Sequence, residues 1–254
     1  AGFGTNLSFT IPEPVLDGQT YPSVFGPYAG SAGEFIFVVG DPRNPGFLYW
    51  TNGNDIESTA DSNFIELCNP SEVLMNGCVL DGIPYCFSDK RSWRILPSFE
   101  GGQTGAGSSF FPQETTTGKG LAGRYGICVG DAIYFVSFDG VYRTRGDVVE
   151  SLTDDSLAPL FRRDGTFISD FVVPVSPIDF LSPNDISLIF SFDGLYLTFK
   201  AVDASFYTYF MSFLTRGWVL DSIGTGSITK SGRELLTDDA DNVIVGTSGG
   251  KVLI

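Results

Sequence analysis

The chain has 254 residues, of which 43% are hydrophobic and 14% are aromatic, and its formal net charge is −15. This acidity disfavours a sequence-independent grip on nucleic-acid phosphates and binding to anionic membranes. Histidine is absent, so Ser-His-Asp catalysis, Cys-His catalysis and histidine-based zinc sites are all excluded.

The first predicted elements are two β-hairpins that follow an irregular start. Residues 1–33 are rich in Gly, Pro and Ser and are expected to form an irregular segment or a closing strand. Aromatic and aliphatic residues at 35–39 and 47–50 predict one hairpin, and those at 85–88 and 93–95 predict another. Each pair of runs flanks a turn sequence that contains Asp.

Two later stretches carry nearly the same sequence. Residues 133–144 read IYFVSFDGVYRT and residues 189–198 read IFSFDGLYLT; SFDG begins at Ser137 and again at Ser191, 54 residues later. Asp-Gly tolerates the positive φ that a two-residue hairpin loop favours at both central positions, which predicts such loops at these Asp-Gly pairs. The flanking strands are apolar at nearly every position, so both of their faces should be covered.

This repeat predicts an all-β fold of the β-propeller type. A last hairpin sequence lies at 243–254, which gives about five units spaced roughly 50 residues apart, as in propeller blades. One blade cannot bury both faces alone, but a ring of blades can. We therefore expect a propeller of about five to six blades over residues 34–254, with long inter-blade loops and an insertion loop at 100–124. Helical sequence is confined to 151–161, where one or two turns are expected before Pro159.

Carboxylates are the remaining route to catalysis, because a glycosidase built on a propeller needs two acids about 5 to 9 Å apart. Most Asp residues lie in turn sequences, in which the side chain usually bonds the local backbone. The GKG sequence at 118–120 lacks the spacing of a phosphate-binding loop, and the acidic run at 237–242 lacks the Gly and distal Glu of an EF-hand loop. We therefore expect no catalytic residue, no cofactor and no metal site. Acids that qualify by position alone are Asp41, Asp61, Glu66, Asp81 and Glu114.

The four cysteines show no C-x-x-C spacing. Cys86 and Cys128 fall inside or beside strand sequences, where a small buried thiol is ordinary. Cys68 and Cys78 could form a disulfide around a turn, although reduced folding in the cytosol is the default expectation.

No apolar stretch is long enough to span a membrane, and the start AGFGTNLSFT lacks the basic and hydrophobic regions of a signal peptide. Membrane insertion is therefore not expected. The start at Ala1 and the strand-like end favour a processed product or a fragment of a longer chain.

Five short pieces of sequence stand out by their order along residues 26–254. They are Gly40-Asp41-Pro42, Leu48-Tyr49-Trp50, Asn69-Pro70-Ser71-Glu72, Asp139-Gly140-Val141-Tyr142 and Thr153-Asp154-Asp155. This order resembles tail-associated β-propeller proteins of bacteriophages, of the nozzle or hub type found in short-tailed phages. Such proteins are usually much longer than this chain.

The resemblance implies a non-enzymatic structural protein of the virion tail that folds in the host cytoplasm. It would form a homo-oligomeric ring, contact other tail proteins such as the adaptor and fibres, and take part in tail assembly and DNA ejection. The family has no catalytic residues to carry over. The acidity then has two interpretations: it keeps an aromatic-rich protein soluble, or it forms a conduit wall that repels DNA.

Two alternatives remain at this point. In a receptor- or glycan-binding propeller, Trp50, Trp93 and Trp218 would be exposed platforms for sugar rings, whereas in the other interpretation each is part of the core. A propeller glycosidase is the second alternative, and it would need two acids in the central channel.

Overall fold

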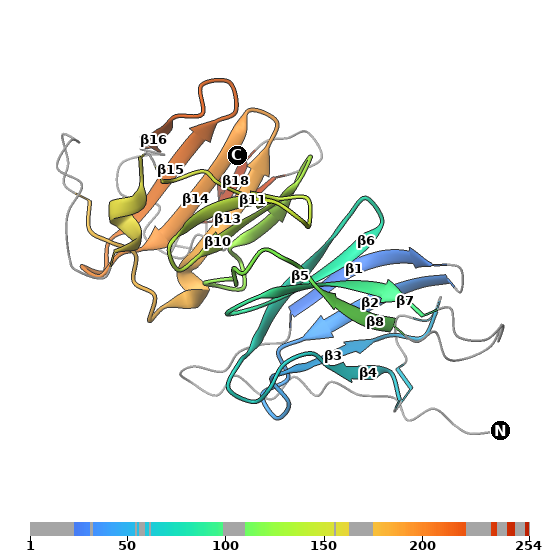
Figure 1. Ribbon diagram of the computed structural model, residues 1–254. Coiled ribbons are helices and arrows are strands. Elements are labelled where there is room, and N and C mark those ends of the chain that lie inside the picture. The colour runs from blue at the N-terminus through green and yellow to red at the C-terminus, as the bar shows by residue number, and fades with distance from the viewer. Residues whose placement is uncertain are drawn as a thin grey trace. The chain divides into compact units, whose positions relative to one another are not determined.

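The computed structural model contains strands and two short 3-10 helices, η1 (Ala158–Phe161) and η2 (Pro183–Asp185), among its described residues. The all-β prediction is confirmed. The chain divides into two compact units, Ala1–Gly120 and Leu121–Ile254 (Figure 1). None of the described helices is long and apolar enough to cross a bilayer. The structure describes residues 23–30, 33–53, 55, 59–60, 62–98, 110–154, 156–162, 175–221, 235–237, 243–246 and 252–253.

The first unit contains two four-stranded antiparallel sheets, and in each sheet every strand pairs with the next strand along the chain. Sheet 1 contains β1 (Ser23–Gly30), β2 (Gly33–Val39), β3 (Phe47–Trp50) and β4 (Phe64–Glu66). Sheet 2 contains β5 (Leu74–Leu80), β6 (Ile83–Ser88), β7 (Ser92–Pro97) and β8 (Phe110–Glu114).

The second unit repeats this up-and-down topology. Sheet 3 contains β9 (Ile127–Val129), β10 (Ile133–Ser137), β11 (Gly140–Thr144) and β12 (Val149–Ser151). Sheet 4 contains β13 (Ile186–Ser191), β14 (Gly194–Lys200), β15 (Phe206–Ser212) and β16 (Trp218–Asp221). Sheet 5 contains β17 (Leu235–Thr237), β18 (Val243–Gly246) and β19 (Val252–Leu253).

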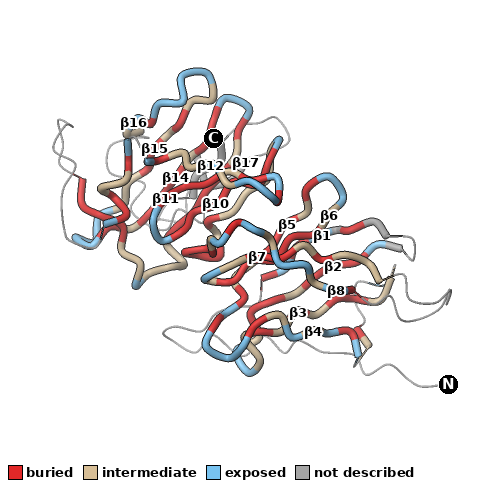
Figure 2. The backbone as a smooth tube through the Cα atoms, in the orientation of Figure 1, coloured by how far each residue is buried: buried red, intermediate tan, exposed pale blue. Residues whose placement is uncertain are grey.

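Several strands are buried on both faces, as their apolar sequences predict. Every residue of β10 is buried, and in β6 and β13 a single residue of each strand is only partly buried (Figure 2). Successive residues of a strand point to opposite faces, so an unbroken buried run requires cover on each side of the sheet.

Aromatic packing holds the two sheets of the first unit together. The ring of Phe110, at the start of β8, lies 5.1 Å from that of Phe37 and 5.2 Å from that of Trp50, measured between centroids and edge-on in both cases. Phe25 of β1 packs against Gly77 of β5, where a Cβ would lie 2.5 Å from the ring. Only glycine permits this close approach, and β1 accordingly lies against β5.

In the second unit, as in the first, strands that begin neighbouring sheets lie side by side: β13, the first strand of sheet 4, lies against both β9 and β17, the first strands of sheets 3 and 5. Just before β9, Tyr125 forms a parallel bridge with Ser187 of β13. The N–H of Leu188 donates to the carbonyl oxygen of Tyr125 at 3.0 Å. Within each unit, therefore, the first strand of one sheet lies beside the first strand of the next sheet.

All five predicted hairpins are present, and they are β2–β3, β6–β7, β10–β11, β13–β14 and β18–β19. The two SFDG copies nevertheless occupy different places in their sheets. The first copy joins the second and third strands of sheet 3, and the second copy joins the first and second strands of sheet 4. The sequence repeat thus marks a kind of hairpin and does not mark equivalent positions in successive sheets.

The predicted reason for the two Asp-Gly pairs was wrong. Gly140 and Gly194 are paired strand residues, and the central loop positions are occupied by Phe-Asp, with no positive φ at either residue. Gly194 is required instead by the close approach of β15, because a Cβ there would lie 1.9 Å from the carbonyl oxygen of Met211. Positive φ at both central positions occurs at Asp81-Gly82, with values of 50° and 73°.

Two predicted segments differ from the structure, and a third contains a strand. An irregular segment or a closing strand was expected at 1–33; strand β1 lies inside it and pairs with β2, and residues 1–22 are outside the described residues. The insertion loop expected at 100–124 is wrong over residues 110–114, which form β8. This strand contains Pro and polar residues, which do not predict a strand, but it lies at the edge of its sheet, where Pro is tolerated. In 151–161, η1 includes Pro159 in its first turn and does not end before it.

Phe110 and Phe111 offer a test of the first-unit core. We expect Phe110→Ala to lower the free energy of unfolding by about 3 to 5 kcal/mol, because it empties a site among packed rings. Phe111→Ala is the matched control, since the side chain of Phe111 is 47% exposed and its removal should cost much less. Denaturant unfolding followed by circular dichroism measures both. Equal losses for the two variants would contradict this packing.

Gly194 tests the close approach of β14 and β15. Gly194→Ala should destabilise the protein by about 2 to 3 kcal/mol, because the two strands must separate to admit the methyl group. Gly217→Ala is the control, since the nearest atom to a Cβ there is 3.6 Å away. Urea unfolding curves for the two variants give the comparison, and a Gly194→Ala variant as stable as the parent would refute the requirement.

Candidate binding site

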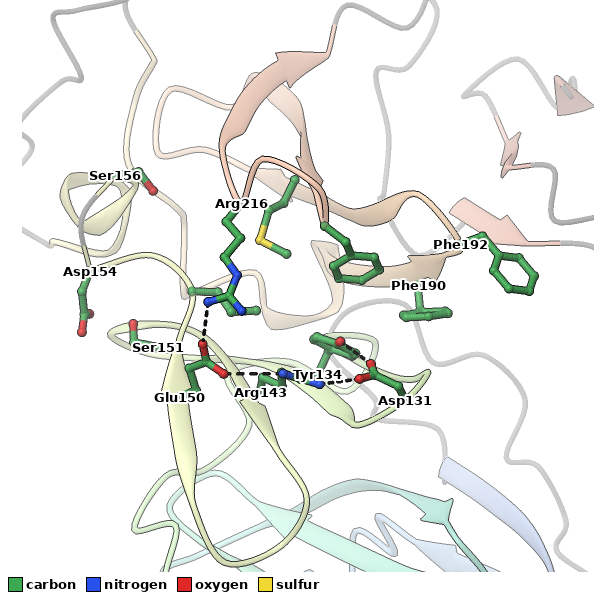
Figure 3. Close-up of a pocket in the computed structure, with 13 residues that line it drawn as sticks. Asp131, Tyr134, Arg143, Glu150, Ser151, Asp154, Ser156, Phe190, Phe192 and Arg216 are labelled. Carbon is green, nitrogen blue, oxygen red and sulfur yellow. Dashed lines mark hydrogen bonds and ion pairs between the residues drawn. The ribbon is translucent and has the colours of Figure 1, made fainter.

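The second unit contains a pocket of about 690 Å³, lined by residues of sheets 3 and 4 (Figure 3). Sheet 3 contributes residues of β10, β11, β12 and the loop before β10. Sheet 4 contributes residues of β13, β15 and the loops that follow these two strands. The volume falls within the range of small-ligand pockets.

A chain of alternating charges crosses one side of the pocket. Arg216 contacts Glu150 at 3.4 Å, Glu150 contacts Arg143 at 3.6 Å, and Arg143 forms an ion pair with Asp131 (Figure 3). Arg145 also reaches Asp131, at 3.4 Å. The bond from Arg216 to Glu150 joins sheet 4 to sheet 3, and the indole N–H of Trp218 makes a second link by donating to the carbonyl oxygen of Leu152 at 2.8 Å.

The protonation states within this chain are fixed by its contacts. Burial pushes the pKa of Asp131 upward, but the hydrogen bond from the Tyr134 hydroxyl and the charge of Arg143 outweigh it, so this pKa lies below its ordinary value. Burial and the bond to Asp131 raise the pKa of Tyr134. Asp131 is therefore held ionised, which is the opposite of what a general acid requires.

Aromatic rings form another part of the lining. The rings of Tyr134, Phe190 and Phe213 lie 5.4 to 5.7 Å apart, measured between centroids. Phe192, in the β13–β14 loop, lines the same pocket and is 81% exposed. The pocket thus combines guanidinium donors, hydroxyl groups and aromatic surface, an arrangement suited to binding an amphipathic group.

The acids singled out from the sequence serve other purposes. Asp41 accepts bonds from the backbone of Arg43 at 2.9 Å and from the Tyr49 hydroxyl at 2.8 Å, within the β2–β3 turn. Burial raises its pKa, but these bonds outweigh burial and the pKa is lowered. Asp81 occupies the β5–β6 turn, and Asp61 and most of the run 237–242 lie outside the described residues. Glu66 and Glu114 end β4 and β8.

The three tryptophans and three of the four cysteines are buried, whereas Cys128, for which a buried thiol was expected, is only partly buried. Trp50, Trp93 and Trp218 are 4%, 3% and 7% exposed, so none offers a platform to a sugar ring. All four cysteines are free, which corrects the possible disulfide between Cys68 and Cys78. The thiol of Cys68 donates to the carbonyl oxygen of Glu72 at 3.5 Å, and burial together with the charge of Glu72 raises its pKa to about 12.

A buried carboxylate connects two turns of the first unit. Glu72, which precedes β5, accepts bonds from the Ser88 hydroxyl at 2.5 Å and from two nitrogens of Arg91 at 3.0 Å. Its side chain is 4% exposed and that of Arg91 is 33% exposed. Arg91 also pairs with Glu114 at 3.1 Å and lies over the ring of Trp93. Glu72 therefore anchors the β6–β7 turn to the segment before β5.

Sequence reasoning did not identify the pocket, because its residues come from separate strands; Asp154, in the fifth of the ordered pieces, was singled out for another reason. Arg216 and Glu150 are 66 positions apart, and neither belongs to a recognisable motif. A weak signal was present at Arg143, a charged residue inside an otherwise apolar strand. An internal charge of this kind needs a partner, and the structure supplies Asp131 and Glu150.

Glu72→Gln should lower the free energy of unfolding by about 2 to 4 kcal/mol at neutral pH, because it breaks a largely buried ion pair. Burial raises the pKa of Glu72, but the bonds from Arg91 and Ser88 lower it more, so the folded pKa lies below the ordinary value of 4.5. The stabilisation is present above that value and is lost as the pH falls through the folded pKa. The cost of the substitution should therefore shrink below pH 4.5.

Glu114→Gln is the control, because the side chain of Glu114 is 51% exposed and its pairing with the same arginine contributes little. Denaturant unfolding of both variants across the pH range gives the test. A cost of Glu72→Gln that is the same at neutral and acidic pH would contradict an ionised anchor.

Comparison with known proteins assigns no family to this arrangement. No protein-family model matches the chain, and no curated protein matches it. The chemistry of the pocket is therefore argued from its own residues.

Proposed function

We propose that the chain is a β-propeller module that serves as a non-enzymatic structural component of a phage tail, in the nozzle or hub. The observation that best supports a propeller is that, within each unit, the first strands of neighbouring sheets lie side by side. In a propeller, each blade is a four-stranded meander, and blades pack face to face around a common axis. The parallel bridge between Tyr125 and Ser187 has the direction that first strands of neighbouring blades would share.

The unbroken burial of strands supports the same arrangement. A blade between two neighbouring blades has no face exposed to solvent, whereas an outer sheet of a sandwich has one such face. Strand β10, buried at every residue, fits a blade. In this proposal the five sheets are successive blades.

The tail function rests on the ordered pieces of sequence, and the structure gives several of them a common purpose. Asp41 and Tyr49, from the first two pieces, are hydrogen-bonded at 2.8 Å. Thr153, from the fifth piece, accepts a bond through its hydroxyl from the N–H of Val141 in the fourth, at 3.0 Å. Glu72, from the third, anchors a hairpin turn. The pieces therefore act as fold determinants, as expected of a scaffold whose function is assembly.

Charge supports a place along the path of DNA. With a net charge of −15, the protein repels phosphates at short range, so DNA could slide past it without sticking. The glycan-binding alternative has lost the platforms that favoured it, because all three tryptophans are buried.

Mass spectrometry of gradient-purified virions, encoded by the genome that carries this sequence, tests the proposal. We expect peptides of the chain in the particles, and immunogold labelling with an antibody to the chain should mark the tail. A chain that is abundant in infected cells but absent from purified particles would overturn the proposal.

A further inference from the structure

The two faces of sheet 1 are both apolar, but they are covered to different extents. Phe37, Leu48 and Trp50 are buried in the core that sheet 1 shares with sheet 2. Val38 and Tyr49, their neighbours along β2 and β3, point to the other face and are only partly buried. A strand that is apolar at nearly every position predicts cover on both faces, so the sequence predicts more cover on this outer face than the chain supplies.

The outer face carries an unbroken apolar row across all four strands, which we call the outer strip. Val24 of β1 pairs with Val38 of β2. Val38 pairs in turn with Tyr49 of β3, and Tyr49 pairs with Phe64 of β4. Val24 is 61% exposed and Phe64 is 44% exposed. Single exposed apolar residues are ordinary on a protein surface, whereas a contiguous strip marks an interaction surface.

Three aromatic rings form one end of the outer strip and its surroundings. The rings of Phe47 and Phe64 are stacked at 5.3 Å between centroids, and that of Tyr49 lies 6.2 Å and 6.3 Å from them. The Tyr49 hydroxyl already donates to the carboxylate of Asp41 at 2.8 Å. Because this polar group has its partner within the chain, Tyr49 offers mainly its ring, and the surface that covers the strip should be apolar as well.

The order of side chains makes the outer strip complementary to itself. The strip runs from two valines, Val24 and Val38, to two aromatic residues, Tyr49 and Phe64. When a second copy is turned about a two-fold axis parallel to the strands, the two strips meet in reverse order. Val24 of each copy then faces Phe64 of the other, and each small side chain meets a large one. Two sheets can pack evenly in this way, as the inner faces of a sandwich do.

Charge opposes such a contact only weakly. Among the described residues, the charged side chains on this face of the strands are Glu34 and Glu66, which are exposed and lie at its two ends, outside the strip. Facing sheets lie about 10 Å apart, which is about the Debye length at 0.1 M salt, so repulsion between facing carboxylates is largely screened. The net charge of −15 on each copy still acts at low salt, which predicts an association that salt strengthens.

We propose that the outer strip is a self-association surface, through which two copies of the chain pack sheet 1 on sheet 1 about a two-fold axis. Four strands spaced about 4.8 Å apart span only about 15 Å, whereas a standard interface buries about 800 Å² on each partner. The dimer is therefore weak and forms at high protein concentration. This inference goes beyond the proposed function and does not depend on it.

Sedimentation velocity of the whole chain, from about 1 µM to about 500 µM, tests the proposal. We expect the sedimentation coefficient to rise from the monomer value towards the dimer value, and to do so at lower protein concentration as salt is raised from about 0.05 M to 0.5 M. Val24→Asp should weaken dimerisation about tenfold or more, because it places a charge opposite Phe64. Val219→Asp is the matched control, since Val219 is also a valine of an edge strand, 55% exposed, and this variant should dimerise like the parent.

A size-swap cycle tests the orientation of the two copies. Val24→Phe would place two large side chains opposite each other, and Phe64→Val would leave a gap, so each change alone should weaken dimerisation. The double variant Val24→Phe/Phe64→Val should recover it. Val24 and Phe64 lie on opposite edges of the same sheet, so recovery requires that they meet between copies.

A chain that stays monomeric at every concentration would overturn the proposal, because the strip is then left to another part of the chain or to a different protein. Equal dimerisation of Val24→Asp and Val219→Asp, a dimer that salt weakens, or a double variant no better than the single variants would also overturn it. Circular dichroism at low concentration should show that the variants fold like the parent, and the apolar size-swap variants keep the test valid if Val24→Asp does not fold. Presence of the chain in virions is a separate outcome, so this inference and the proposed function can fail independently.

Discussion

The structure depends on one constraint: strands β6, β10 and β13 are apolar on both faces and must be covered on both. Every residue of β10 is buried, and β6 and β13 come close to this. A single meander cannot satisfy such strands, since at least one of its faces would meet water. The sheets that contain these strands must therefore pack against neighbouring sheets. In both units the contact runs through first strands, β1 with β5 and β13 with β9 and β17.

Polar side chains then fix where each meander turns. The Asp41 carboxylate closes the β2–β3 turn, the Thr153 hydroxyl binds the backbone of β11, and Glu72 joins the β6–β7 turn to the segment before β5. Each of these groups is satisfied by a specific donor or acceptor, so it stabilises one arrangement of the chain over others. Packing supplies most of the free energy of folding, and these bonds select the register and the turn.

The sequence was sufficient to predict the hairpins, because aromatic and aliphatic runs separated by turn residues are a local signal. It was insufficient where a strand carries polar residues or Pro, as β8 does, since its place in the sheet depends on Phe110 meeting rings of sheet 1. The sequence also could not show why residue 194 must be glycine, because this depends on the carbonyl oxygen of Met211 in the neighbouring strand. The pocket escaped prediction for the same reason: Arg216 and Glu150 meet only after two sheets have packed.

The central claim is that, within each unit, consecutive meanders pack with their first strands side by side. A crystal structure of the chain tests it most directly. The account predicts an electron-density map in which β9, β13 and β17 lie next to one another, in the same direction, and in which β1 lies beside β5. A map in which these sheets stack as a sandwich, with first strands at opposite edges, would contradict it.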